Sequence, residues 1–192
     1  MPLILTAGPA SEPVSLDEAK AHCRIDTDAE DTLVSSLILA ARLHVEQSLG
    51  LALIRQSWSL YLDRWPETPY VELPLAPLIG VDAVRLYSPT GSFVTLDPGL
   101  FFADTVSRRP RLARGDAQCW PLPGRGINGI EIAFTAGHGA GADDVPMPLR
   151  QAVKLLVAHW YEAREPVTFG DDAGAVPLTV ASLINPYREA KL

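Results

Sequence analysis

The sequence lacks the features of a membrane, secreted or disulfide-linked protein. No apolar run approaches the roughly 18 residues that a membrane-spanning helix needs. Residues 1–7 contain no basic segment and only a short apolar stretch, which argues against a signal peptide. The two cysteines, Cys23 and Cys119, lie far apart and outside any CxxC motif, so we expect two unpaired thiols in a reducing compartment.

A surplus of positive charge is also lacking. The chain has 16 basic and 23 acidic residues, and its net charge of -7 repels polyanions. Binding to nucleic acid through phosphate neutralisation is therefore disfavoured. Two explanations fit the acidic surplus. It is compatible with a surface along which DNA slides without binding, and it is also typical of an ordinary solvent-exposed exterior.

The composition is that of a globular protein, and helices are expected at its N-terminal end. Hydrophobic residues make up 47% of the 192 residues, which is enough to build a core. Ser15 and Glu18 have the spacing of a capping box, which predicts a short helix to about Cys23. A longer helix is expected near Leu33 to Leu49, with Gly50 as its end. Its apolar stripe is predicted to contain Leu33, Val34, Leu37, Ile38, Ala40, Ala41, His44, Val45 and Ser48.

The middle of the chain alternates apolar and polar residues with a period of two, which is typical of strands. This pattern is clear from Leu53 to Asp63 and from Ile127 to Ala136, and shorter extended pieces are expected between residues 70 and 96. Residues 97–126 are rich in Pro, Gly and Arg. We expect irregular connections there, with one or two short strands.

Two more helices are predicted toward the C-terminus. Pro146 and Pro148 open a helix that ends before Pro166. A second helix of about two turns is expected over residues 177–184, where Asn185-Pro186 breaks it.

This order of elements predicts an α+β fold, in which the N- and C-terminal helices pack together and a β-rich insertion lies between them. The expected ranges are 1–52 for the N-terminal helical part, 53–145 for the β-rich insertion, and 146–192 for the C-terminal helices and tail.

Two motifs resemble ligand sites, and each has a simpler explanation. The segment Gly124–Gly129 matches GxGxxG, but a strand follows it where a dinucleotide site needs a helix, so we expect a turn. A second group is acidic and lacks the glycine and closing glutamate of a calcium loop, so we expect it to cap a helix, with a chance divalent site as the alternative. Its members are Asp26, Asp28, Glu30 and Asp31.

Candidate metal ligands and nucleophiles are similarly isolated. His159, Glu162 and Glu165 have helical spacing, and His22 adjoins Cys23, but no second ligand cluster accompanies either group. No GxSxG motif or thiol-protease context occurs. We therefore predict no catalytic, cofactor-binding or metal-binding residues.

Several short motifs, taken in order, connect the chain to a known family. They are Pro13–Lys20, His22–Asp26, Glu46–Gly50, Gln56–Trp58, Leu73–Pro77, Phe134–Gly139, Val145–Ala152, His159–Glu165 and Leu183–Arg188. Their ordered combination resembles the phage head-tail connector (adaptor) family, in the β-insertion variant found in tailed phages and gene transfer agents. The resemblance spans about residues 13–188 and is slight over residues 97–125.

The resemblance implies a non-enzymatic structural subunit in the neck of a virion or gene transfer agent particle, assembled in the bacterial cytoplasm. It implies a ring of copies, dodecameric to match the portal, between the portal protein and a stopper or tail-completion protein. Double-stranded DNA would pass through the channel without sequence-specific binding. No cofactor and no membrane are implied.

The C-terminal tail is the expected partner-binding segment, through Pro186, Tyr187, Arg188 and Leu192, because it follows a helix-breaking proline. A frayed terminus is the alternative. Two other functions also remain open. The chain could be another neck component, such as a stopper or tail-completion protein, or a small α+β ligand-binding protein or enzyme that uses its Gly-rich loops.

Overall fold

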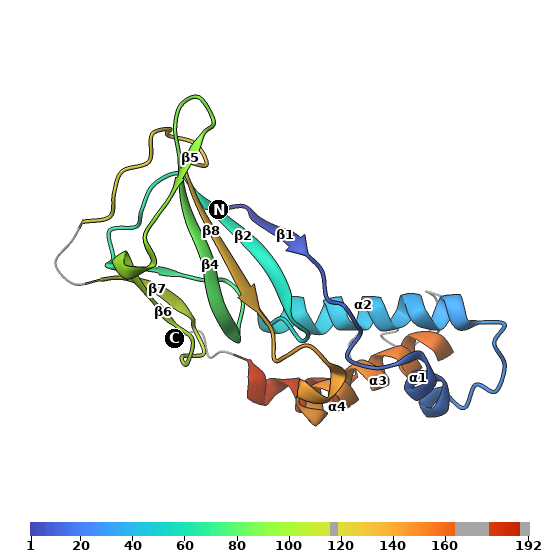
Figure 1. Ribbon diagram of the computed structural model, residues 1–192. Coiled ribbons are helices and arrows are strands. Elements are labelled where there is room, and N and C mark those ends of the chain that lie inside the picture. The colour runs from blue at the N-terminus through green and yellow to red at the C-terminus, as the bar shows by residue number, and fades with distance from the viewer. Residues whose placement is uncertain (116–118, 164–176, 189–192) are drawn as a thin grey trace. The chain divides into compact units, whose positions relative to one another are not determined.

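The computed structural model describes residues 1–115, 119–163 and 177–188 (Figure 1). The chain divides into two compact units. The sheet unit comprises residues 1–9 and 55–138, and the helical unit comprises residues 10–54 and 139–192. Helices and antiparallel sheets thus occupy separate parts of the chain, and the predicted α+β class is confirmed.

The described part of the helical unit contains four α-helices (Figure 1). They are α1 (Leu16–Cys23), α2 (Asp31–Leu49), α3 (Met147–Glu162) and α4 (Leu178–Ile184). Helix α3 is central, because α1, α2 and α4 each pack against it. The predicted packing of the two long helices, α2 and α3, is confirmed, and Leu156 of α3 is completely buried between them and their neighbours.

Local signals set the ends of these helices as expected. The Ser15 side chain accepts a hydrogen bond from the Glu18 backbone N–H at 3.2 Å, and the Glu18 carboxylate accepts one from the Ser15 backbone N–H at 2.9 Å. These two bonds form the predicted capping box of α1. Helix α2 ends at Gly50, whose φ of 66° is the left-handed conformation that glycine adopts without strain.

The buried stripe of α2 differs from the predicted one. Val34, Ile38, Ala41, Val45 and Leu49 face the core, whereas the predicted stripe residues Leu33, Ala40 and Ser48 are exposed. Arg42 and Glu46 also lie on the buried side, where both are paired. Periodicity alone did not show that two charged residues belong to the inner face.

The main sheet of the other unit has five antiparallel strands in the order β1-β2-β8-β4-β5 (Figure 1). They are β1 (Leu3–Ala7), β2 (Gln56–Leu62), β8 (Ile130–Ala136), β4 (Leu78–Tyr87) and β5 (Phe93–Thr95). The central register aligns Leu60 with Ile132 and Ile132 with Val84, which gives one apolar face. The opposite face aligns Tyr61, Glu131 and Arg85 and is polar.

A second, three-stranded sheet has the order β3-β7-β6. Its strands are β3 (Tyr70–Glu72), β7 (Arg111–Arg114) and β6 (Phe101–Asp104). Strands β6 and β7 confirm the short strands that we predicted within residues 97–126.

Two strand boundaries differ from the sequence patterns, and the structure adds one strand near the N-terminus. Strand β2 begins at Gln56, because Leu53 and Ile54 are completely buried in the core of the helical unit. Strand β8 begins at Ile130, after the turn that precedes it. Residues 1–9 belong to the sheet unit, because β1 pairs antiparallel with β2.

Candidate functional site

The predicted partner-binding segment lies at the end of α4. A 3₁₀ turn, Asn185–Tyr187, follows the helix, and the Arg188 backbone N–H donates a hydrogen bond to the Asn185 carbonyl at 3.1 Å. Tyr187 is half-buried against the helical core, whereas Pro186 and Arg188 are exposed. Leu192 lies outside the described residues. The structure therefore brings three of the four predicted residues together and shows that Tyr187 has a packing role.

The exposed side of α2 is a surface that the sequence analysis missed. We call it the outer α2 face, and it consists of Thr32, Leu33, Ser36, Leu39, Ala40, Leu43 and Gln47. None of these residues is charged. Leu39 and Leu43 are about two-fifths exposed (43% and 41%) and stand one helical turn apart. The uncharged run from Thr32 to Ala41 was visible in the sequence, but we assigned part of it to the buried stripe.

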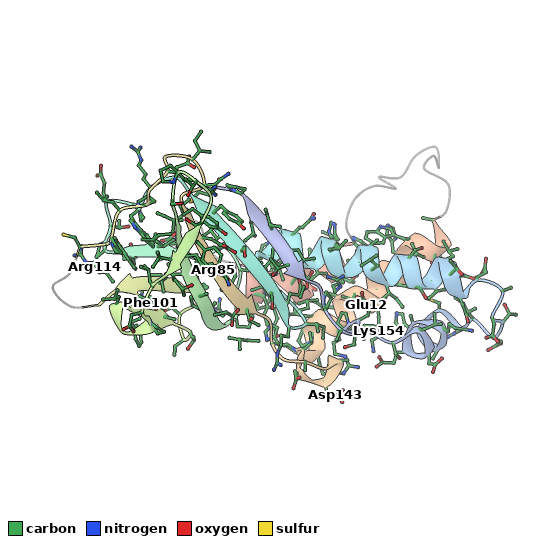
Figure 2. The ribbon with its side chains drawn as sticks, turned by 45° about the horizontal axis from the view of Figure 1, so that its top comes forward. Glu12, Arg85, Phe101, Arg114, Asp143 and Lys154 are labelled. Atoms are coloured by element: carbon green, nitrogen blue, oxygen red, sulfur yellow. The ribbon has the colours of Figure 1, made fainter. Side chains whose placement is uncertain are left out.

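The charged residues of α2 are instead used within the helical unit. Arg42 donates hydrogen bonds to Glu12 and Glu46, each at 2.7 Å, and Glu12 is labelled in Figure 2. Glu46 also accepts the backbone N–H of Leu53 at 2.8 Å. Burial by itself would lower the pKa of Arg42, but the two carboxylates outweigh it and raise that pKa. This network ties α2 to the segments that enter and leave the helical unit.

Arg150 of α3 forms a second internal connection. Its guanidinium donates to Glu18 at 2.7 Å, to Asp143 at 3.1 Å and to the Pro13 carbonyl at 3.1 Å (Figure 2 labels Asp143). The arginine thus links the start of α1 to the start of α3. Arg150 lies more than 130 positions from Pro13 and Glu18 in the sequence, and these bonds join the two ends of the helical unit's sequence. The motif residues Ser15, Glu18 and Arg150 therefore have a structural role.

A buried carboxylate organises the polar face of the main sheet. Glu131 is 5% exposed and accepts hydrogen bonds from Ser59 at 2.8 Å, Arg85 at 3.0 Å and Tyr87 at 2.6 Å. Burial alone would raise the pKa of Glu131, but these donors outweigh it and lower the pKa. Conversely, the hydrogen bond to Glu131 raises the pKa of Tyr87 to about 12. The carboxylate therefore connects β2, β8 and β4, and it is buried rather than open to a substrate.

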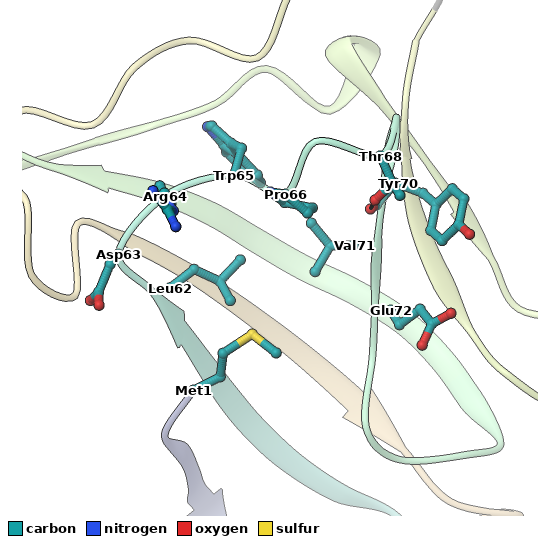
Figure 3. Close-up of a pocket in the computed structure, with 10 residues that line it drawn as sticks. All are labelled: Met1, Leu62, Asp63, Arg64, Trp65, Pro66, Thr68, Tyr70, Val71 and Glu72. Carbon is teal, nitrogen blue, oxygen red and sulfur yellow. Dashed lines mark hydrogen bonds between the residues drawn. The ribbon is translucent and has the colours of Figure 1, made fainter. Parts of the chain in front are cut away.

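A cavity of about 480 Å³ opens in the sheet unit beside the end of β2 (Figure 3). Met1, Leu62 and Val71 point toward one another across it in Figure 3, and Trp65 forms part of its wall. Trp65 is held by stacking on Trp120 at a ring distance of 4.1 Å and by a hydrogen bond to the Pro121 carbonyl. The lining is mainly apolar, and the Gly-rich segment at residues 124–129 is not part of it.

The GxGxxG segment forms a turn, as predicted from its context. A Cβ atom on Gly129 would lie 2.3 Å from the Arg125 carbonyl oxygen, so only glycine fits there. The Arg125 guanidinium donates back to the Asn128 carbonyl at 2.7 Å and 3.0 Å. Strand β8 follows directly, where a dinucleotide site would have a helix N-terminus.

The acidic group before α2 does not cap that helix with side chains, and this part of the prediction was wrong. Glu30 occupies the N-cap position without a side-chain cap hydrogen bond, and it accepts the Tyr161 hydroxyl instead. Asp28 and Asp31 both accept from the Lys20 ammonium, at 2.6 Å and 2.7 Å. These bonds raise the pKa of Lys20 to about 12. In residues 1–115, 119–163 and 177–188, no group of three His, Cys, Asp or Glu residues is arranged to hold a metal ion.

The remaining candidates do not assemble into a reactive group. Burial and the nearby Glu162 carboxylate raise the pKa of Cys23, which disfavours its nucleophilic thiolate form. Glu165, which we considered with His159 and Glu162, lies outside the described residues. None of the described helices is long and apolar enough to cross a membrane.

Comparisons with known proteins agree on one class. Residues 13–82 match the family model described as phage gp6-like head-tail connector protein. A chain in the neck of an empty GTA particle, computed with C6 symmetry, is 30% identical with a TM-score of 0.86, over 100% of this chain and 97% of that one. A chain in the virion of a native gene transfer agent (GTA) particle is 30% identical with a TM-score of 0.85, over the same shares.

A third similar chain comes from the neck of a native GTA particle computed with C12 symmetry. It is 30% identical with a TM-score of 0.77, over 98% of this chain and 97% of that one. No curated protein matches the chain significantly.

Proposed function

The chain belongs to the phage gp6-like head-tail connector family, and we propose that it is the adaptor subunit of a particle neck. In this role, copies form a ring, dodecameric in the particle, between the portal protein and a stopper or tail-completion protein. Double-stranded DNA passes through the ring without sequence-specific binding. The particle is a tailed phage or a gene transfer agent.

One observation carries this proposal: the similarity to neck proteins extends over 100% of this chain and 97% of the similar chains, at 30% identity. A likeness limited to one unit would support a shared domain, whereas this likeness includes the helices and both sheets. The C6 and C12 symmetries of the similar necks support a ring of copies. The charge balance supports passage of DNA, because a net charge of -7 gives phosphates no general attraction.

A structural role also agrees with how the polar residues are used. Arg42, Arg150 and Glu131 each have buried or partly buried partners that hold backbone segments together. Catalysis would instead need a nucleophile, a base and a charge-stabilising group that converge on an open site. The cavity beside Trp65 is lined mainly by apolar surface, which does not supply these groups.

The first test is deletion of the gene in a particle-producing strain. We expect heads that are filled with DNA or leak it and that carry no tails, with tails restored by the wild-type gene. Electron microscopy of the complemented particles should place the chain in a ring directly below the portal. A chain found farther from the portal would identify it as a stopper or tail-completion protein, and normal tails in the deletion strain would reject a neck function.

The second test concerns the C-terminal segment, which we propose docks on the portal or an adjacent copy. Because Tyr187 packs against the helical core, the informative truncation removes only residues 188–192. We expect the truncated protein to fold but to give fewer tailed particles, since small losses per subunit are repeated around the ring. The matched control, Arg188→Ala in the full-length chain, separates loss of one charge from loss of the tail. A wild-type fraction of tailed particles would show that the terminus is frayed.

A further inference from the structure

We infer that the outer α2 face binds the exposed side of α4 on a neighbouring copy, so that the helical units form the contact around the ring. This inference rests on the proposed ring and names the surfaces that would build it. Its starting point is the absence of charge on a long exposed helix side.

The outer α2 face is unusual for a side that contacts only water. A solvent-facing helix side normally carries charged residues, and 20% of this chain is charged. All three charged residues of α2 are instead bound within the helical unit: Asp31 to Lys20, and Arg42 to Glu12 and Glu46. The outer side presents Leu39 and Leu43 among Thr, Ser, Ala and Gln, which suits a dry contact with another protein.

Helix α4 presents a second uncharged surface. Val180 and Ile184 are buried against the core, whereas Leu178, Thr179 and Ser182 are exposed. Leu178 is 88% exposed, which is a costly position for a leucine in water. No charged residue occurs from Pro177 to Tyr187.

The two surfaces lie on different sides of the helical unit. Helix α3 packs against both α2 and α4, whereas α2 and α4 make at most slight contact with each other. The outer α2 face and the exposed side of α4 both point away from α3, since their opposite sides contact the core. Two different surfaces on separate sides make a heterologous contact, which closes into a ring when the rotation between copies is right.

Electrostatics favour uncharged contact surfaces in such a ring. The helical unit has eight basic and fifteen acidic residues, so it carries the whole net charge of the chain. Adjacent helical units would therefore repel one another if charged surfaces met. Contact through the outer α2 face and α4 brings together two surfaces that carry no charged residue.

Substitution of Leu43 provides the first experiment. Leu43→Glu places a charge on the outer α2 face at a half-exposed position, so folding should survive. Ser48→Glu is the matched control, because it adds the same charge to the same helix at an exposed site outside this face. We expect Leu43→Glu to lower the fraction of tailed particles at least tenfold, and Ser48→Glu to leave it unchanged. Equal fractions, with both proteins folded by circular dichroism, would overturn the inference.

Disulfide trapping tests the pairing of the two surfaces. In a Cys23→Ala, Cys119→Ser background, particles carrying both Leu43→Cys and Leu178→Cys are oxidised and run on a non-reducing denaturing gel. We expect a ladder of covalent multimers from the double variant and none from either single variant. Dimers from Leu43→Cys alone would mean that the outer α2 face meets itself, which contradicts the pairing with α4.

The ring and its contact surfaces can fail separately. A ring seen at the neck by electron microscopy, together with no ladder and no effect of Leu43→Glu, would keep the proposed function and reject this interface. Absence of the chain from the neck would reject both.

Discussion

The two units of this protein differ in how they use charge. The sheet unit has eight basic and eight acidic residues and is neutral, whereas the helical unit carries the full charge of -7. Yet the neutral unit buries a carboxylate, Glu131, within its polar face, and the acidic unit leaves a long helix side without charge. The net charge of a unit therefore predicts neither which charged side chains are buried and hydrogen-bonded nor which surfaces carry no charge.

The interiors of the units differ in a related way. The helical unit has an apolar core to which its four described helices contribute, and it also buries the Arg42–Glu46 ion pair on the inner side of α2. The sheet unit has an apolar face of its own, but its three central strands are also joined by the hydrogen bonds to Glu131. We therefore expect a cavity in the apolar core of the helical unit to have the larger effect, and loss of the Glu131 charge in the sheet unit to have a smaller one.

The largest effect is expected from Leu156→Ala in α3. The side chain is completely buried, so its truncation should lower the free energy of unfolding by about 2–5 kcal/mol. Urea unfolding can be followed by circular dichroism at a helix wavelength and by tryptophan fluorescence. Three of the four tryptophans, Trp58, Trp65 and Trp120, belong to the sheet unit, so fluorescence mainly reports that unit.

The two signals turn this substitution into a test of the comparison. If the units unfold separately, only the circular dichroism transition should shift to lower urea. If both transitions shift together, the units unfold as one cooperative structure. Leu122→Ala, at a residue that is 87% exposed, is the control and should shift neither transition. A negligible effect of Leu156→Ala would show that this core tolerates a cavity.

A smaller effect is expected from Glu131→Gln in the sheet unit. The substitution keeps the shape of the side chain but removes the charge that Arg85, Ser59 and Tyr87 donate to. Hydrogen bonds to a buried charged group contribute more than neutral ones, so we expect a loss of about 1–3 kcal/mol, measured by fluorescence in urea. Glu67→Gln, at an exposed position, is the control. An unchanged midpoint would mean that the carboxylate contributes little beyond its size.

The same residue predicts an acid dependence. Since the folded-state pKa of Glu131 is lowered, the stabilisation is present above its unfolded pKa and is lost as the pH falls through the folded value. The difference in stability between wild type and Glu131→Gln should therefore be constant near neutral pH and shrink in acid. Urea midpoints measured from pH 7 down to pH 3 would reveal it, and a difference that grows in acid would contradict the assigned direction.

Much of the fold could be predicted from the sequence, because its signals are local. Capping at Ser15, termination at Gly50 and the alternation in β8 depend on residues that are near one another in sequence, and the structure has each of them. The strands in residues 97–126 were also expected, although their partners were not. The resemblance to connector proteins rested on the order of motifs, and the family match agrees with it.

The missed features depend on distant partners. Arg42 has one partner nearby in sequence, Glu46, but its second partner, Glu12, lies 30 residues away, so the full network is not visible in the local sequence. With Arg42 and Glu46 paired on the inner side of α2, its outer face is left without charge. Pairing of β1 with β2 is likewise a contact across about 50 residues. Sequence periodicity thus located the amphipathic helix α2, but it did not show which of its two overlapping apolar stripes is buried.

The smallest effect is expected from Ser15→Ala, which removes half of the capping box of α1. The alanine cannot accept the Glu18 backbone N–H, so one helix N-terminus loses its cap at a cost of about 1 kcal/mol. The hydrogen bond from the Ser15 backbone N–H is the largest cause of the lowered pKa of Glu18, and it does not need the serine side chain. Glu18 should therefore still accept from Arg150 in the variant.

This leaves a test that distinguishes a cap from a wider role in joining α1 to α3. Ser15→Thr retains an accepting hydroxyl and should keep most of the stability. Ser15→Ala should shift the circular dichroism midpoint in urea slightly. If the units unfold separately, it should leave the fluorescence midpoint of the sheet unit unchanged. A loss from Ser15→Ala as large as that from Leu156→Ala would mean that the cap also sets the position of Glu18 against Arg150. The Glu18–Arg150 ion pair, which links the start of α1 to the start of α3, would then depend on the Ser15 hydroxyl. This contact would contribute as much to the stability of the helical unit as a fully buried leucine of its core.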